Sequence, residues 1–101
     1  MTLAELKTLL STTGIPVAMN TFKTEQQYPY IVYIATGAKN TSADGIVYYS
    51  TPQVQVELYT KDKDLTSEDK VETALSSFFW EKDEGRLDDE NSYMVAYQFT
   101  L

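Results

Sequence analysis

Carboxylates are the only abundant side chains in this sequence that are able to do acid–base or metal chemistry. Six of them fall between residues 81 and 90 (EKDEGRLDDE), with a glycine at position 85. A calcium loop of the EF-hand type needs acidic or amide residues at alternate positions, then a glycine and a distant glutamate. This segment lacks that spacing, so we interpret it as a solvated, charged connection rather than a metal site.

Hydrolysis of a sugar is the other reaction that two carboxylates can catalyse alone. Glu57 lies in an alternating strand pattern and is the least unusual candidate, but nothing separates it from ordinary surface charge. The absence of His and Cys removes imidazole bases, thiol nucleophiles and the usual ligands of zinc, haem and iron–sulfur clusters. The four glycines form no phosphate-binding pattern. We therefore expect no catalytic, cofactor-binding or metal-binding residues, and a protein that is not an enzyme.

Net charge and length narrow the classes of protein that remain possible. The 101 residues carry a formal net charge of −7, which repels nucleic-acid phosphates and acidic membrane surfaces. No apolar run approaches the length of a transmembrane helix, and residues 1–5 do not resemble a secretory signal. The length suits one domain covering residues 1–101.

Two segments have the periodicity of helices. Thr2 and Glu5 fit a capping box at the start of a helix over residues 3–12, and Gly14 is suited to end it. A second helix is predicted over residues 67–80, with a capping box from Thr66 to Asp69. Its expected buried stripe consists of Val71, Ala74, Leu75, Phe78 and Phe79.

The remaining apolar segments have the patterns of strands. Residues 30–35 are apolar on both faces, as in a central strand, and residues 53–59 and 93–101 alternate between apolar and polar. Residues 36–45 are small and polar and are predicted to form a loop. Pro52 is expected to interrupt a strand that begins at Val47.

Together these elements predict an α+β fold in the order α-β-β-β-α-β. We expect an antiparallel sheet of about four strands with two helices packed on one face. Five tyrosines (Tyr48, Tyr49, Tyr59, Tyr93 and Tyr97) exceed what two short helices are expected to cover, and tyrosine suits subunit interfaces. The predicted interface residues are Lys39, Asn40, Thr41, Ser42, Asp44, Tyr48, Tyr49 and Tyr59.

Ordered short blocks over nearly the whole chain resemble a known family. The blocks are Ile15-Pro16-Val17-Ala18, Asn20-Thr21-Phe22, Tyr28-Pro29-Tyr30-Ile31-Val32-Tyr33, Ala43-Asp44, Val47-Tyr48-Tyr49, Val56-Glu57-Leu58-Tyr59-Thr60, Lys63-Asp64, Glu72 to Leu75, Lys82-Asp83-Glu84 and Met94 to Leu101. They are similar to tail completion, or tail terminator, proteins of long-tailed phages and prophages of Gram-positive bacteria.

The resemblance implies a structural role in the virion tail. Such proteins form rings, commonly hexameric, that cap the head-proximal end of the tail tube and meet the head connector. The implied partners are further copies of the chain, the tail tube protein and the connector protein, with assembly in the cytoplasm of the host bacterium. DNA would pass through an acidic lumen without specific binding.

Three alternatives remain open at this stage. The chain is also compatible with another head–tail connector or a minor capsid component, which have similar sizes. A monomeric acidic inhibitor that imitates nucleic-acid charge fits the net charge, although interspersed lysines (Lys61, Lys63, Lys70 and Lys82) weaken that hypothesis. A small hydrolase would need two carboxylates with shifted pKa values in one pocket.

Overall fold

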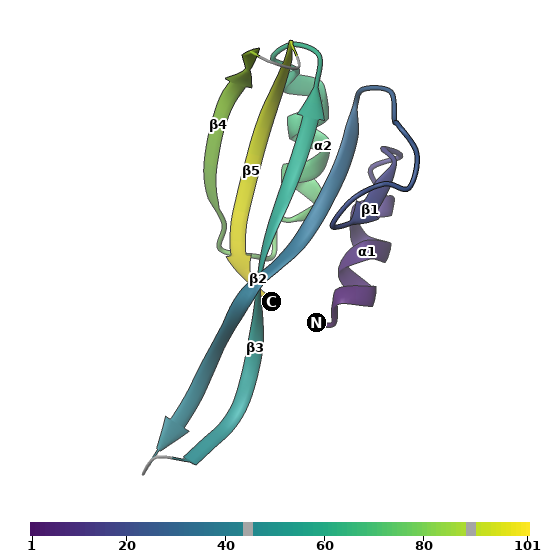
Figure 1. Cartoon of the computed structure of the whole chain (residues 1–101). Helices are drawn as coiled ribbons and strands as arrows, with labels where there is room; N and C mark the ends of the chain where they lie inside the picture. Colours follow the sequence, from purple (N-terminus) through teal and green to yellow (C-terminus); the bar gives the residue numbers. More distant parts are fainter. Residues whose placement is uncertain (44–45, 89–90) are drawn as a thin grey trace.

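The computed structural model describes the backbone of residues 1–43, 46–88 and 91–101, and the side chains of those residues outside 39–50. In chain order the elements are α1 (Leu3–Ser11), β1 (Val17–Met19), β2 (Tyr30–Ala43), β3 (Ile46–Thr60), α2 (Leu65–Ala74), β4 (Glu81–Leu87) and β5 (Ser92–Thr100). The strands form one sheet in the order β1-β2-β3-β5-β4 (Figure 1).

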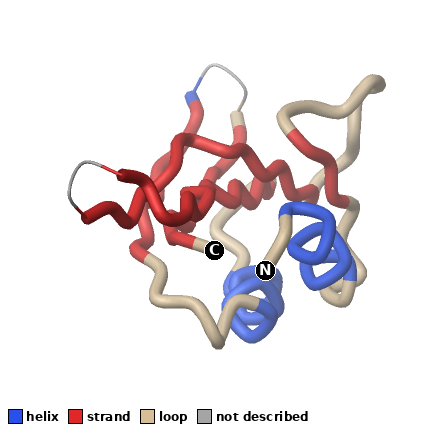
Figure 2. Tube along the Cα trace, turned by 90° about the horizontal axis from the view of Figure 1, so that it is seen from below, coloured by secondary structure: helices blue, strands red, loops and turns tan. Residues whose placement is uncertain are grey.

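The predicted α+β class is confirmed, and both helices lie on the same side of the sheet (Figure 2). The sheet differs from the prediction because it has five strands and is mixed. β1 pairs in parallel with β2, whereas the other three pairings are antiparallel. A three-residue strand is too short to show a period, so the sequence pattern did not reveal β1.

The start of α1 confirms the predicted capping box. The hydroxyl of Thr2 accepts a hydrogen bond from the Glu5 backbone N–H at 3.1 Å, and the Glu5 carboxylate accepts one from the Thr2 N–H at 3.1 Å. The backbone N–H of Thr2, followed by its hydroxyl, lowers the pKa of Glu5, because hydrogen bonds to the carboxylate favour its ionised form. The helix ends at Ser11 with Thr12 as its C-cap, and Gly14 takes a positive φ of 78° that allows the chain to turn away.

The predicted bounds and cap of α2 are wrong. The helix is capped by Asp64, whose carboxylate accepts from the Ser67 N–H at 3.1 Å and from the Ser67 hydroxyl at 2.8 Å. It ends at Ala74, so Phe79 lies beyond it and is 96% exposed instead of buried. Phe78 still reaches the core from the turn after the helix, where its ring stacks on Phe99 at 4.7 Å.

The core lies between the helices and one face of the sheet. Alternate residues point into it over 54–58 of β3 and 95–99 of β5, as the alternating patterns predicted. Its members include Leu6 and Leu10 of α1, Val71 of α2, Leu75, Ile31 and Tyr33 of β2, Val54, Val56 and Leu58 of β3, and Val95, Tyr97 and Phe99 of β5. Tyr93 also packs against this core, so Tyr93 and Tyr97 are not surplus surface tyrosines.

The predicted loop over residues 36–45 is also wrong, because residues 36–43 continue β2. β2 and β3 are 14 and 15 residues long, and their far halves form a two-stranded arm that projects beyond the body of the molecule (Figure 1). The longest dimension of the molecule is accordingly 50 Å, against 27 and 26 Å for the others.

Pro52 lies within β3 and does not interrupt it. Its carbonyl accepts from the Leu101 N–H at 2.9 Å, so it faces the β5 side of the strand. Because the N and C=O of a strand residue point the same way, the missing N–H of Pro52 falls on that side too. It lies just past the final β3–β5 pair, Gln53 with Thr100, where no ladder partner is displaced.

The acidic segment after α2 is a strand rather than a connection over most of its length. Residues 81–87 form β4, which pairs with β5 and makes one edge of the sheet. Residues 89 and 90 lie outside the described part of the chain. β4 is exposed on both faces over residues 81–86, so it lacks the alternation of apolar residues that identifies a half-buried strand.

Candidate functional site

The projecting arm contains most of the residues predicted for a subunit interface. Lys39, Asn40, Thr41 and Ser42 belong to β2, and Tyr48 and Tyr49 belong to β3. Register pairs such as Lys39 with Thr51 and Asn40 with Ser50 join the two strands along the arm. Asp44 lies outside the described residues. Tyr59 does not belong to the arm, because it lies in the body of the sheet beside Tyr30.

The two outer edges of the arm are open within the described pairings. β1 accompanies β2 only along Ile31 to Tyr33, and β5 accompanies β3 only from Gln53 to Thr60. Along residues 38–43 and 46–51 the described backbone pairs only across the hairpin itself. An edge of this kind presents N–H and C=O groups that can hydrogen-bond a strand of another chain.

A second feature is a cleft on the face of the sheet opposite the helices. The segment that follows β1 rises on that side (Figure 2) and forms one wall with residues 20–26 and Tyr28. The sheet forms the floor with Tyr30 and Val32 of β2 and Glu57 and Tyr59 of β3. The cleft has a volume of about 700 Å³.

Aromatic rings line this cleft, which we call the tyrosine cleft. Tyr30 stacks on Tyr28 at 5.5 Å and on Tyr59 at 4.9 Å, with an angle of 17° between the planes in both pairs. The Phe22 ring meets Tyr30 edge-on at 5.6 Å. Offset stacking and edge contacts of this kind stabilise the walls.

Glu57 places a carboxylate on the floor of the tyrosine cleft. Its Oε1 accepts a hydrogen bond from the Tyr59 hydroxyl at 3.0 Å, and its Oε2 accepts one from the Gln55 amide at 2.7 Å. Gln55 in turn accepts from the Gln98 amide at 3.1 Å. The carboxylate is therefore held by neutral donors in a fixed position on the sheet.

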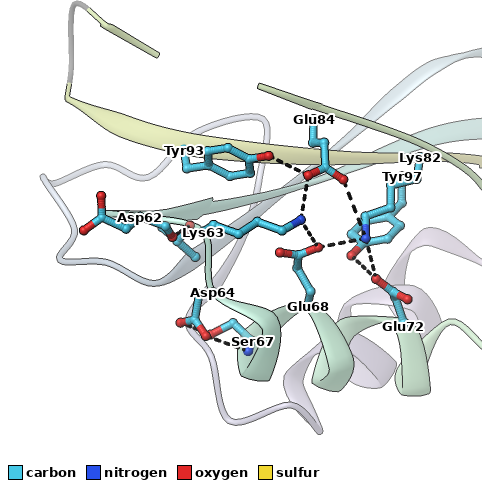
Figure 3. A network of polar contacts seen from close by, with 11 residues as sticks. Asp62, Lys63, Asp64, Ser67, Glu68, Glu72, Lys82, Glu84, Tyr93 and Tyr97 are labelled. Atoms are coloured by element: carbon cyan, nitrogen blue, oxygen red, sulfur yellow. Dashed lines mark hydrogen bonds and ion pairs between the residues drawn. The ribbon is translucent and has the colours of Figure 1, made fainter. Parts of the chain in front are cut away.

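On the helix side a network of ion pairs joins β4 to α2 (Figure 3). Glu68 is only 2% exposed, and its Oε1 lies 2.8 Å from Lys82 Nζ and 2.9 Å from Lys63 Nζ. Lys82 also lies 3.0 Å from Glu72, and Lys63 lies 2.6 Å from Glu84. We call these five residues the lysine–glutamate network.

Two tyrosines extend this network and their pKa values respond to it. Burial and then the hydrogen bond to Glu72, 2.9 Å long, raise the pKa of Tyr97 well above its usual range. The hydrogen bond from Tyr93 to Glu84 raises the pKa of Tyr93. The Lys63 and Tyr93 donors lower the pKa of Glu84, and the Glu84 and Glu68 acceptors raise the pKa of Lys63. Each group is thus held in the form it already has at neutral pH.

A network of this kind has the marks of a structural connection rather than a catalytic site. Catalytic groups usually have pKa values moved toward neutrality, whereas those of Lys63, Glu84 and Tyr97 are moved away from it. One geometric feature is compatible with the hydrolase hypothesis, because Glu25 and Glu57 both line the tyrosine cleft. In the described ranges no three acidic residues are grouped to hold a metal ion, and neither helix is long and apolar enough to cross a membrane.

Comparison of the chain with protein-family models and with curated proteins gives no match. The fold and the contacts therefore carry the functional argument. The sequence predicted Tyr59 as an interface residue and Glu57 as a possible acid, but it did not predict that both line one cleft with residues from the segment 20–30. The signal for their proximity to residues 20–30 is the pairing of Tyr30 with Tyr59, which depends on strand register rather than on local sequence.

Proposed function

We propose that this chain is a structural subunit of a phage tail that assembles into a ring at the head-proximal end of the tail tube. The observation that carries the proposal is the projecting arm formed by the far halves of β2 and β3, with two open edges. The resemblance to tail terminator proteins supplies the place in the particle, and the arm supplies a means of joining subunits.

An arm of this shape needs a partner on physical grounds. An isolated two-stranded ribbon is at best marginally stable in water. Within the described ranges no third strand pairs with the arm beyond Gln53, and both helices lie over the body of the sheet (Figure 1). A neighbouring subunit that covers the arm would bury its surface, and head-to-tail contacts repeated by rotation close into a ring.

The net charge supports a ring that lets DNA pass. At −7 per chain, a ring has an acidic surface that repels the phosphate backbone, so DNA is expected to slide through without specific binding. The inhibitor hypothesis is weaker, because Lys63 and Lys82 already pair with three of the carboxylates. The expected partners are further copies of this chain, the tail tube protein and the head connector protein, and no reaction is expected.

Solution mass tests the proposal most directly, measured by light scattering on a size-exclusion column over a concentration series. The matched variant replaces residues 40–50 by Asn-Gly, which connects the register pair Lys39 and Thr51 through a tight hairpin turn. We expect a discrete ring mass for the natural chain, or a complex with co-expressed tail tube or connector protein. The variant should keep a folded body, seen as a cooperative thermal transition in far-ultraviolet circular dichroism, but remain monomeric and uncomplexed.

Two outcomes would contradict the proposal. One is a natural chain that stays monomeric at every concentration and does not co-purify with either partner protein. The other is an arm-shortened variant that assembles as the natural chain does. Binding to the connector without binding to the tail tube would assign the chain to the connector side of the junction instead.

A further inference from the structure

The charge of Glu57 has no positive partner in the described part of the chain. The salt bridges there, with nitrogen and oxygen within 4.0 Å, involve other carboxylates. Glu57 is half-buried, and its two hydrogen bonds come from a phenol and an amide. Buried charges are usually paired, because a charge removed from water loses solvation, and the half-buried Glu57 carboxylate bears part of that cost.

The walls of the tyrosine cleft suit a cation. A guanidinium group is planar, is weakly hydrated, and stacks on the face of an aromatic ring while its N–H groups bind a carboxylate. Tyr28, Tyr30 and Tyr59 bring three rings to the same cleft as Glu57. Each carboxylate oxygen of Glu57 has a second lone pair beyond the one that its described donor uses.

We infer that the tyrosine cleft binds an arginine side chain of a partner protein, with the guanidinium on the Glu57 carboxylate and beside the tyrosine rings. The cleft volume of about 700 Å³ is within the range of small-ligand sites. The net charge of −7 attracts such a segment from a distance. The inference concerns a single chain and is independent of ring formation, so it survives a failure of the proposed function.

Two other charged residues line the cleft and enter the test. Glu25 adds a second carboxylate to the wall and reinforces the attraction for a cation. Lys23 lies on the same wall and opposes a cationic ligand. Replacing Lys23 by Gln should therefore leave the affinity for an arginine peptide unchanged or increase it.

The experiment is a titration of the ¹⁵N-labelled full chain with the tripeptide acetyl-Gly-Arg-Gly-amide, followed by backbone amide shifts. The same peptide with citrulline in place of arginine keeps the shape and removes the charge. We expect shifts concentrated at residues 22–30 and 55–59, and at least about fivefold weaker binding of the citrulline peptide, the factor that about 1 kcal/mol of a cation–π contact and charge pairing implies.

Glu57→Gln is the decisive variant, because the amide oxygen still accepts a hydrogen bond from Tyr59. Its affinity for the arginine peptide should fall at least about fivefold. Glu81→Gln is the matched control, since Glu81 is an exposed carboxylate on β4 outside the cleft and should leave binding unchanged. Tyr28→Leu removes a rim ring that is 37% exposed, and it should weaken binding without involving Glu57.

Several results would overturn the inference. Equal binding of the citrulline peptide would show that charge has no role. An equal loss of peptide affinity in the Glu57 and Glu81 variants would show that the net charge of the surface, rather than a specific site, causes the binding. Shifts spread over the whole acidic surface, or none at millimolar peptide, would also contradict a specific site. Weaker binding after Lys23→Gln would also contradict the inference, because removal of a positive charge from the cleft should not weaken the binding of a cation.

Discussion

The two faces of the sheet hold carboxylates in opposite electrostatic settings. On the helix side Glu68 is almost completely buried, and two lysines lie within 3 Å of it. On the other face Glu57 is half-buried, and neutral donors alone reach it among the described residues. The first arrangement connects β4 to α2 within the chain, whereas the second leaves a charge that a partner can neutralise. Pairing inside the chain therefore separates a structural carboxylate from a candidate binding carboxylate.

The largest expected effect comes from breaking the lysine–glutamate network. Replacing Lys82 by Met leaves the buried Glu68 with Lys63 as its remaining cation, and we expect a loss of about 2 kcal/mol in the free energy of unfolding. This value is below the 3–5 kcal/mol typical of a fully buried pair, because Lys82 itself is 27% exposed. Urea denaturation monitored by circular dichroism measures it.

Two further variants show whether that loss arises from the buried charge. Lys70→Met removes an exposed lysine from α2, the helix that contains Glu68, and should change stability by less than about 0.5 kcal/mol. The double variant Glu68→Met with Lys82→Met should recover much of the loss, because an apolar pair often replaces a buried ion pair at little cost. No recovery would mean that Lys82 acts through packing rather than through Glu68.

Alkaline pH should weaken the helix side of the sheet. The pKa of Tyr97 and that of Lys63 are raised in the folded chain above their ordinary values of 10.0 and 10.5. A raised folded pKa gives stability that is fully present below the unfolded pKa and is lost as the pH rises through the folded value. We therefore expect stability to fall above about pH 10, because both groups lose their protons more easily in the unfolded chain.

Tyr97→Phe separates this effect from general alkaline denaturation. The variant loses the hydrogen bond to Glu72 at neutral pH, but its further loss between pH 9 and pH 11 should be smaller than in the natural chain. Thermal melts at the two pH values measure the difference. An unchanged alkaline loss would mean that other groups cause it.

At acid pH, the lowered pKa of Glu84 predicts stability that is present above about pH 4.5 and is lost below it.

The parts of the fold that the sequence predicted are those with local patterns. The Thr2 capping box is fixed by residues three apart, and the alternation in β3 and β5 reflects one buried face, so both predictions are confirmed. The strand β4 and the arm residues 36–43 were missed, because neither has the alternation of apolar residues that marks a half-buried strand. The α2 prediction ran too far because Phe78 keeps the helical spacing while it packs from a turn.

The candidate sites depended on information that local patterns do not contain. Most predicted interface residues gathered on the arm, since they are close in sequence on either side of one hairpin. The tyrosine cleft depends on the register of β2 against β3 and on the path of residues 20–28, both of which are set by tertiary contacts. Glu57 was considered only as an acid, because its missing cation becomes visible only in three dimensions.

The smallest expected effect on stability is that of Glu57→Gln. The glutamine oxygen keeps one acceptor for the Tyr59 hydroxyl, whereas the hydrogen bond from the Gln55 amide is lost. Because no described ion pair is lost, the free energy of unfolding should change by about 1 kcal/mol. Urea denaturation beside the Lys82→Met variant makes the comparison under one condition. A loss as large as that of Lys82→Met would show that Glu57 supports the fold as Glu68 does. A small loss together with weaker arginine-peptide binding would instead assign the two carboxylates to different roles, one inside the chain and one between chains.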